Sequence, residues 1–225
     1  MSRSNPDINK FISLQNLSIL YEFKFDPIKD YLNQTQELIL GVEQDVSEKI
    51  KKWDSEQHDD PETPNGFAVY ESEVMATGEF RPLLYRSMFI TIYGFFEHEF
   101  KTLCGYAGGI SGTKLRPNDL SGNNYIDQCR RFVSKVLNVN LDNLQNDWAE
   151  ITKFQLLRNS FAHNNGILKD TNKNNIDFIH KTDGLSIDEE TYEIFIETNE
   201  FLIILINKLV KFLDKTIEEI IRQKE

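Results

Sequence analysis

The chain has 225 residues, of which 40% are apolar and 27% are charged, and its formal net charge is −11. This composition is that of a folded globular protein, and the length allows one good-sized core or two small ones. A protein that coats long nucleic acid carries a basic surface, so the acidic balance argues against that class of protein.

No segment predicts export or membrane insertion. The beginning, MSRSNPDINKF, lacks the apolar core of a signal peptide. The most apolar run covers only residues 201–206, whereas a membrane span needs about 20 residues. We therefore expect a cytoplasmic protein without a membrane partner. Cys104 and Cys129 fit neither a metal-binding spacing nor a disulfide framework, and we expect buried thiols.

The first predicted element is a long amphipathic helix over about 26–55, because apolar residues recur there every three or four positions. Asp26 and Pro27 would supply its cap and its first-turn proline. The segment HDDPETPNG, residues 58–66, has the composition of a loop.

A second helix is expected from about Pro82 to Tyr106. It is apolar nearly all round, which is typical of a helix at the centre of a core. Gly108-Gly109 would end it. The core should include its aromatic stripe, which consists of Phe89, Phe95, Phe96 and Phe100.

The remaining elements follow a second loop at 111–124. Helices are expected over about 123–137 and 144–163. Apolar and polar residues alternate within 174–188, and Thr182-Asp183-Gly184 is a turn signal. This pattern predicts a small β-hairpin. A last helix would run over about 189–222. The fold class is therefore mainly α: a helical N-terminal extension at 1–75, then a helical bundle at 76–225 with one small β-hairpin.

Polar side chains gather near the end of the helix expected at 144–163, in the stretch LRNSFAHNNG. Asn159 and His163 are four residues apart, so they lie on one helix face. Arg158 is one step round, about 100° away, and its long side chain can bend toward the same surface. The helix dipole favours a protonated His163, and Asn164-Asn165-Gly166 would supply a left-handed stop.

An arginine and a histidine on one short surface suit phosphodiester chemistry. Arginine can bind two phosphate oxygens and stabilise charge that builds on the phosphorus. Histidine can move a proton near neutral pH. No carboxylate cluster accompanies them, so we expect neither a metal nor a cofactor. Metal-free cleavage needs an internal nucleophile, which RNA has in its 2′-hydroxyl.

The local charge agrees with a phosphate site. Residues 112–170 include eight basic and six acidic side chains, so this segment has a charge of +2 while the rest of the chain has −13. The basic trio Arg130, Arg131 and Lys135 lies in this segment. It either tracks an RNA backbone or forms a solvated helix face.

The spacing Arg-Asn-x-x-x-His near a helix end resembles the motif of the HEPN superfamily, the helical domains of many prokaryotic toxin, phage-defence and RNA-processing nucleases. The runs NDLSGNNYIDQCRRFVSKVLNVN and FQLLRNSFAHNNG, with Trp148 between them, are similar to one subgroup of uncharacterised bacterial HEPN proteins. The upstream YGFFEHEF resembles the aromatic-Glu stretch on the first core helix. The resemblance covers about 80–222 and leaves residues 1–75 outside.

The resemblance implies a bundle of four or five helices that dimerises, so that two copies of the motif face each other in one composite cleft. His163 would transfer the proton, Arg158 would bind or position the scissile phosphate, and Asn159 would orient both through hydrogen bonds. Glu97 is a further candidate by its place after the aromatic run. The implied partners are RNA (tRNA, mRNA or rRNA), a second copy of the chain, and an antitoxin or other defence-system protein.

These residues also have plain structural interpretations. Arg158 and Asn159 can pair at a helix end, and His163 suits the helix dipole there. Glu97-His98-Glu99 lacks the spacing of a zinc protease, and on a helix these side chains point in different directions. His58 and His180 are expected to be solvated.

Two hypotheses from different classes follow. The first is a metal-independent endoribonuclease that acts as a homodimer, as a toxin or a phage-defence effector. The second is a non-catalytic helical interaction module, in which the motif helix builds a dimer seam and the N-terminal helix docks a partner. A nucleotide or second-messenger binder would use the same basic residues without cleavage. An open cleft across a two-fold axis, lined by Arg158 and His163, favours the first hypothesis. Pairing of both residues inside one subunit, or cover from residues 1–75, favours the second.

Overall fold

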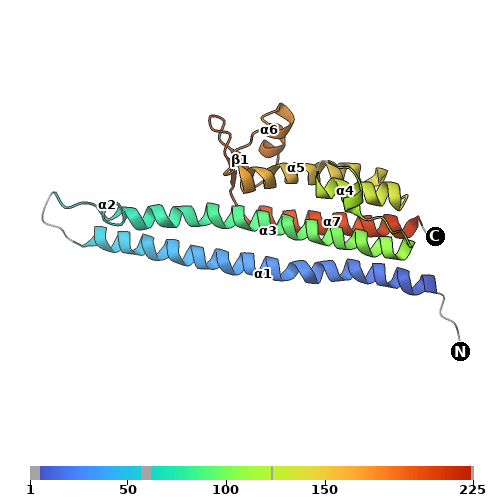
Figure 1. Ribbon diagram of the computed structural model, residues 1–225. Coiled ribbons are helices and arrows are strands. Elements are labelled where there is room, and N and C mark those ends of the chain that lie inside the picture. Colours follow the sequence, from blue (N-terminus) through green and yellow to red (C-terminus); the bar gives the residue numbers. More distant parts are fainter. Residues whose placement is uncertain (1–5, 57–61, 123, 224–225) are drawn as a thin grey trace.

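The computed structural model describes residues 6–56, 62–122 and 124–223, which form seven α-helices and one two-stranded sheet (Figure 1). The expectation of a mainly α protein with one small β-hairpin is therefore confirmed. Among the described residues, no helix combines the length and the apolar character that crossing a membrane requires.

The three longest helices are α1 (Pro6–Ser55), α3 (Glu71–Ser111) and α7 (Asn199–Arg222). Figure 1 shows α3 and α7 side by side in the middle of the molecule, with α1 along one side and α5 (Gln145–His163) on the other. Buried apolar residues from all four helices belong to a single core cluster. The middle pair of helices therefore separates α1 from α5.

Shorter elements complete the fold. They are α2 (Gly66–Val69), the 3-10 turn η1 (Pro117–Asp119), α4 (Tyr125–Arg131), its π-helical continuation η2 (Phe132–Val136), the 3-10 turn η3 (Asp142–Leu144), α6 (Lys173–His180), β1 (Leu185–Ile187) and β2 (Ile194–Ile196). The expected helix over 123–137 is thus α4 plus η2, and the helix expected at 144–163 is confirmed as α5.

Helix α1 begins about twenty residues before the expected start at 26, so the assignment of Asp26 and Pro27 as its first turn was wrong. The helix passes through Pro27 because its buried face continues on both sides: Leu14, Tyr21, Phe25 and Leu32 are all fully buried. A proline inside a helix leaves the carbonyl four residues earlier without its partner. Here that residue is Phe23, which is 66% exposed, so water can reach the carbonyl.

Polar contacts also attach α1 to the middle helices. Lys24 forms an ion pair with Glu99 of α3, with 2.6 Å between Nζ and Oε2. The Tyr85 hydroxyl donates to Gln36 Oε1 at 2.8 Å, and the Ser18 hydroxyl donates to Asp214 of α7 at 2.7 Å. The expected domain boundary between residues 75 and 76 falls inside α3.

Helix α3 is longer than expected at both ends. It begins at Glu71 rather than Pro82, and it continues through Gly108-Gly109 to Ser111, where Gly112 in the left-handed conformation (φ 69°) ends it. Its early turns are held against α1, for example by the ion pair between Arg81 and Glu43. The packing of the whole helix therefore outweighs the helix-breaking tendency of one proline and two glycines.

The aromatic stripe of α3 lies in the core, as expected. Phe89, Phe96 and Phe100 are fully buried, and Phe95 packs edge-on against Phe25 of α1 with ring centroids 4.9 Å apart. Cys104 and Cys129 are buried free thiols, which confirms that expectation. The Cys104 thiol lies 3.7 Å from the carbonyl oxygen of Cys129, so it links α3 to α4.

The C-terminal third differs from the sequence expectation. Residues 173–180 form helix α6, and the turn at 182–184 leads into β1 rather than joining two strands. The antiparallel partner of β1 is β2, with Ser186 opposite Phe195. The predicted last helix from 189 was therefore wrong at its start, because residues 194–196 are strand and α7 begins at Asn199. Alternation at 174–188 indicated a hairpin but placed it about ten residues too early.

Candidate functional site at the end of helix α5

The end of α5 exposes the polar stretch that the sequence singled out. His163 is the last helical residue, and the carbonyl of Ser160 accepts from the backbone N–H groups of Asn164 at 3.0 Å and Gly166 at 2.9 Å. Asn165 (φ 52°) and Gly166 (φ 85°) are both left-handed, so the expected stop is confirmed. A Cβ atom at Gly166 would also lie 3.2 Å from Arg86 Cζ. Glycine therefore suits both the positive φ angle and the narrow space at this position.

Arg158, Asn159 and His163 come together on this end of the helix. Arg158 Nη1 lies 3.2 Å from Asn159 Oδ1 and 3.4 Å from His163 Nε2. The guanidinium has donors only, so it can donate to His163 Nε2 only in the tautomer that carries the ring proton on Nδ1.

Glu97 of α3 joins the cluster from the middle layer. Its Oε2 lies 3.8 Å from Arg158 Nη2, and the two side chains are 22% and 28% exposed. Burial raises the pKa of Glu97, and the nearby Arg158 charge opposes that rise. The Nε atom of Arg158 is buried and has no hydrogen-bond partner within the described part of the chain. Arg158 thus has a buried Nε, while its terminal nitrogens contact Glu97, Asn159 and His163.

Tyr93 lies one helical turn before Glu97 and is fully buried. Its hydroxyl donates to the carbonyl of Ile151 at 3.2 Å, which fixes α3 against α5. Burial raises the pKa of Tyr93 well above its ordinary value, and the charge of Glu97 raises it further. The phenol therefore stays protonated and serves as a neutral support for the cluster.

The cluster is accessible from solvent. Asn159 and His163 are exposed, and Figure 1 places α1 on the far side of α3 and α7 from α5. Residues of α1 therefore do not cover the motif. Arg158 does have partners inside the subunit, in Glu97, Asn159 and His163. The arrangement combines an open surface with an arginine that is already oriented.

The basic trio Arg130, Arg131 and Lys135 lies elsewhere. The Arg130 guanidinium stacks over the Trp148 ring at 4.9 Å and donates to Gln145 at 3.0 Å, both in the first turns of α5. At 1.5 Å per residue, Gln145 is about 27 Å along the helix from His163. Arg131 pairs with Asp127 at 3.0 Å. The structure does not bring the trio to the motif, and Arg130 and Arg131 are engaged in local contacts.

Glu97, His98 and Glu99 point in three directions, as expected on a helix. Glu97 faces Arg158, His98 is exposed, and Glu99 is buried against Lys24. Among the residues that the structure describes, no three histidine, cysteine, aspartate or glutamate side chains form a group that could hold a metal ion. His180 ends α6 and lies 3.6 Å from Glu189, while His58 lies outside the described residues.

A cavity of about 700 Å³ lies away from this cluster. It lies between α3 and the loop that follows, with Lys101, Lys114 and Arg116 among its lining residues. Sequence reasoning counted Lys114 and Arg116 only in the charge of residues 112–170 and did not single out Lys101, because it treated the loop at 111–124 as a connection. The available signal was a series of glycines inside an otherwise apolar helix.

Comparisons with protein-family models, with curated proteins and with solved structures found no match in any of the three. The interpretation of the site therefore depends on the residues and geometry described above.

Proposed function

We propose that the protein is a metal-independent endoribonuclease, with Arg158, Asn159 and His163 at its active site. The observation that carries the proposal is the exposed arrangement in which one guanidinium lies 3.4 Å from a histidine ring nitrogen and 3.2 Å from an amide oxygen. A phosphate bound at Arg158 would replace part of these contacts. His163 would then be close to the group that must lose a proton.

The reaction follows from these groups. His163 Nε2 takes the proton of the RNA 2′-hydroxyl, and the 2′-oxygen attacks the adjacent phosphorus. Arg158 neutralises the charge that builds on the non-bridging oxygens. The bond from phosphorus to the 5′-oxygen breaks, and that oxygen takes up a proton. The products are a 2′,3′-cyclic phosphate and a 5′-hydroxyl end.

Glu97 and Asn159 position the reacting groups in this proposal. Glu97 lies behind Arg158 with Oε2 3.8 Å from Nη2, and Asn159 lies beside it. A second copy of the chain would face the first and contribute an imidazolium that gives the leaving oxygen its proton. The acidic chain suits a selected RNA, such as a tRNA, an mRNA or an rRNA. We propose a toxin or phage-defence role, with a neutralising protein as a further partner.

The test combines expression in a bacterial host with cleavage of RNA by the purified protein. Wild type should arrest growth and cut a defined RNA, and a 2′-deoxy substitution at the cut site should block cleavage. His163→Ala should lower the cleavage rate by about 10²–10⁴-fold, the usual contribution of general acid–base catalysis. Arg158→Ala should cause a comparable loss.

His180→Ala is the matched control, because His180 also ends a helix and is 46% exposed but lies outside the cluster. It should retain full activity. Intact RNA with wild type and all variants would overturn the proposal. Equal cleavage by wild type and His163→Ala would show that the motif is not the active site.

A second candidate function is a non-catalytic interaction module, and the surface of α1 favours it. Large apolar side chains are exposed along that helix, with Phe23 66%, Tyr31 58% and Leu38 71% accessible. Such side chains are typical of a surface that a partner helix covers. This function predicts intact RNA together with a complex that the substitution Leu38→Asp disrupts.

A further inference from the structure

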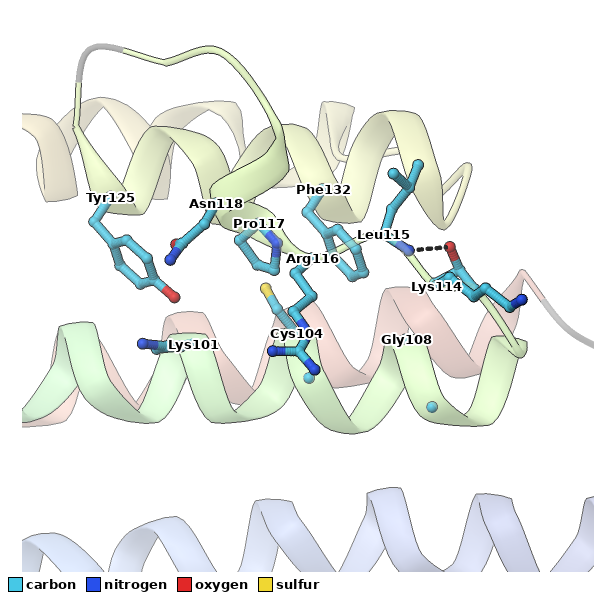
Figure 2. Close-up of a pocket in the computed structure, with 13 residues that line it drawn as sticks. Lys101, Cys104, Gly108, Lys114, Leu115, Arg116, Pro117, Asn118, Tyr125 and Phe132 are labelled. Carbon is cyan, nitrogen blue, oxygen red and sulfur yellow. Dashed lines mark hydrogen bonds between the residues drawn. The ribbon is translucent and has the colours of Figure 1, made fainter.

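The cavity between α3 and the loop at 112–118 has a volume of about 700 Å³. Pockets for small organic ligands usually measure about 300–1,000 Å³. Figure 2 shows the loop on one side of the cavity and α3 on the other, with Tyr125 and Phe132 extending toward α3 from the loop side. The cavity is therefore large enough for a molecule of nucleotide size and is much larger than a single ion.

The charged side chains of this cavity are all cationic. Lys101, Lys114 and Arg116 line it, and no aspartate or glutamate does so. Within the described part of the chain none of the three forms an ion pair, although the chain as a whole has a net charge of −11. In Figure 2 the Arg116 guanidinium reaches from the loop toward α3 beside Cys104. Three cations around one cavity, with no ion-pair partner among the described residues, favour a ligand with several negative charges.

The side of α3 that lines the cavity includes the glycines Gly105 and Gly109. Lys101, Gly105 and Gly109 are spaced by four residues, so they lie in one row along the helix. A Cβ atom at Gly105 or Gly109 would meet nothing within 4 Å, so packing does not require glycine at either position. Glycine is unfavourable inside a helix relative to alanine. Close approach of a bound molecule to the helix backbone would explain both glycines.

Gly108 has a different role from its neighbours. A Cβ atom there would lie 3.0 Å from Phe132 Cζ, so this glycine lets η2 pack closely on α3. Tyr125 lines the cavity on the same side as Phe132, and its ring centroid lies 5.1 Å from Lys101 Nζ. This cation–π contact holds the ammonium group at the cavity. The cavity is thus shaped by packing, while Gly105 and Gly109 leave it open.

We propose that this cavity binds a phosphate-bearing small molecule of nucleotide size. Arg116 holds the phosphates through its planar fork, and Lys101 and Lys114 add charge on either side. Gly105 and Gly109 provide the space for the ligand on α3. The proposal does not depend on the ribonuclease activity, because none of these residues belongs to the cluster at the end of α5.

The test is calorimetric titration of the full chain with ATP, with pyrophosphate and with adenosine. ATP should bind, pyrophosphate should compete with it, and adenosine alone should bind at least 100-fold more weakly. Arg116→Ala should weaken ATP binding by about 10- to 100-fold, the usual effect of removing charge-assisted hydrogen bonds.

The glycines provide a test that separates binding from folding. The double variant Gly105→Ala/Gly109→Ala should raise Tm by a few degrees without ligand, because alanine favours the helix. The same variant should bind ATP at least tenfold more weakly, because its methyl groups occupy the cavity. Gly94→Ala is the matched control: it lies on α3 and also has nothing within 4 Å of its Cβ. It should raise Tm and bind ATP as wild type does.

Three results would overturn the proposal. The first is no binding of ATP or pyrophosphate to wild type at millimolar concentration. The second is unchanged affinity in both the Arg116 and the glycine variants. The third is binding of a short RNA that Arg116→Ala abolishes while ATP does not bind, which would assign the cavity to RNA instead.

Discussion

At the scale of single residues, the cluster at the end of α5 depends on how one arginine is held. The base of Arg158 is buried, and Glu97 approaches its outer nitrogen to 3.8 Å, which is long for a strong ion pair. Glu97 therefore orients the guanidinium without neutralising it fully. The guanidinium also lies 3.4 Å from His163 Nε2, the atom that would take the proton in the proposed reaction.

The raised pKa of Glu97 gives a pH-dependent prediction. A carboxyl whose folded-state pKa is raised binds its proton more tightly in the folded state, so its contribution to stability is present at low pH and is lost as the pH rises through the folded pKa. Glu97→Gln does not ionise. It should therefore increase the free energy of unfolding relative to wild type at pH 7, and this difference should disappear toward pH 4.

Urea denaturation of both proteins at pH 4 and pH 7 measures this effect. Glu37→Gln, at an exposed position of α1, is the control and should show no such difference. A Glu97→Gln variant that is less stable than wild type at pH 7 would show that the attraction between Glu97 and Arg158 outweighs the cost of burial.

At the scale of elements, two long helices continue through prolines because their buried faces extend on both sides. Pro27 follows Phe25 and precedes Leu32, both fully buried, and Pro82 is followed by Leu84 and Tyr85, which are also buried. In each helix the carbonyl that loses its hydrogen bond belongs to an exposed residue, Phe23 or Gly78. Packing along the whole helix thus outweighs a local penalty.

Replacing Pro27 should therefore stabilise the protein. Pro27→Ala restores a backbone hydrogen bond and removes the clash with the preceding turn, a gain that the larger conformational freedom of the unfolded chain partly offsets. We expect a net increase of about 1–2 kcal/mol in the free energy of unfolding. Thermal denaturation measures the change. Pro64→Ala, in the loop before α2, is the control, and an equal Tm for wild type and Pro27→Ala would contradict the argument.

At the scale of the whole molecule, α1 covers one side of the pair formed by α3 and α7 (Figure 1). Its buried apolar side chains from Leu14 to Ile39 belong to the same core cluster as those of both helices. Glu99, buried in α3, has its charge partner Lys24 on α1. Removing α1 would thus expose apolar surface and leave a buried carboxylate unpaired.

A truncated chain of residues 76–225 should consequently fail to form the native structure. It lacks α1 and also the first five residues of α3. We expect it to aggregate or to bind a hydrophobic dye while it retains helical circular dichroism. A soluble fragment with cooperative unfolding would instead support the division into an extension at 1–75 and an independent bundle.

The sequence by itself determined the features that depend on neighbouring residues. The left-handed stop at Asn165-Gly166 follows from local backbone chemistry, and the three motif residues share one surface because helical spacing places them there. The approach of Glu97 was expected only from resemblance, because its partner is 61 positions away along the chain.

Only the tertiary structure decided the features that depend on distant segments. The start of α1, the path of α3 through Pro82 and Gly108-Gly109, and the late position of the β-hairpin all follow from burial against other elements. The cavity with Lys101, Lys114 and Arg116 exists because the loop after α3 folds back over that helix. A sequence pattern records which residues can lie on one face, whereas the free energy of burying that face depends on what covers it.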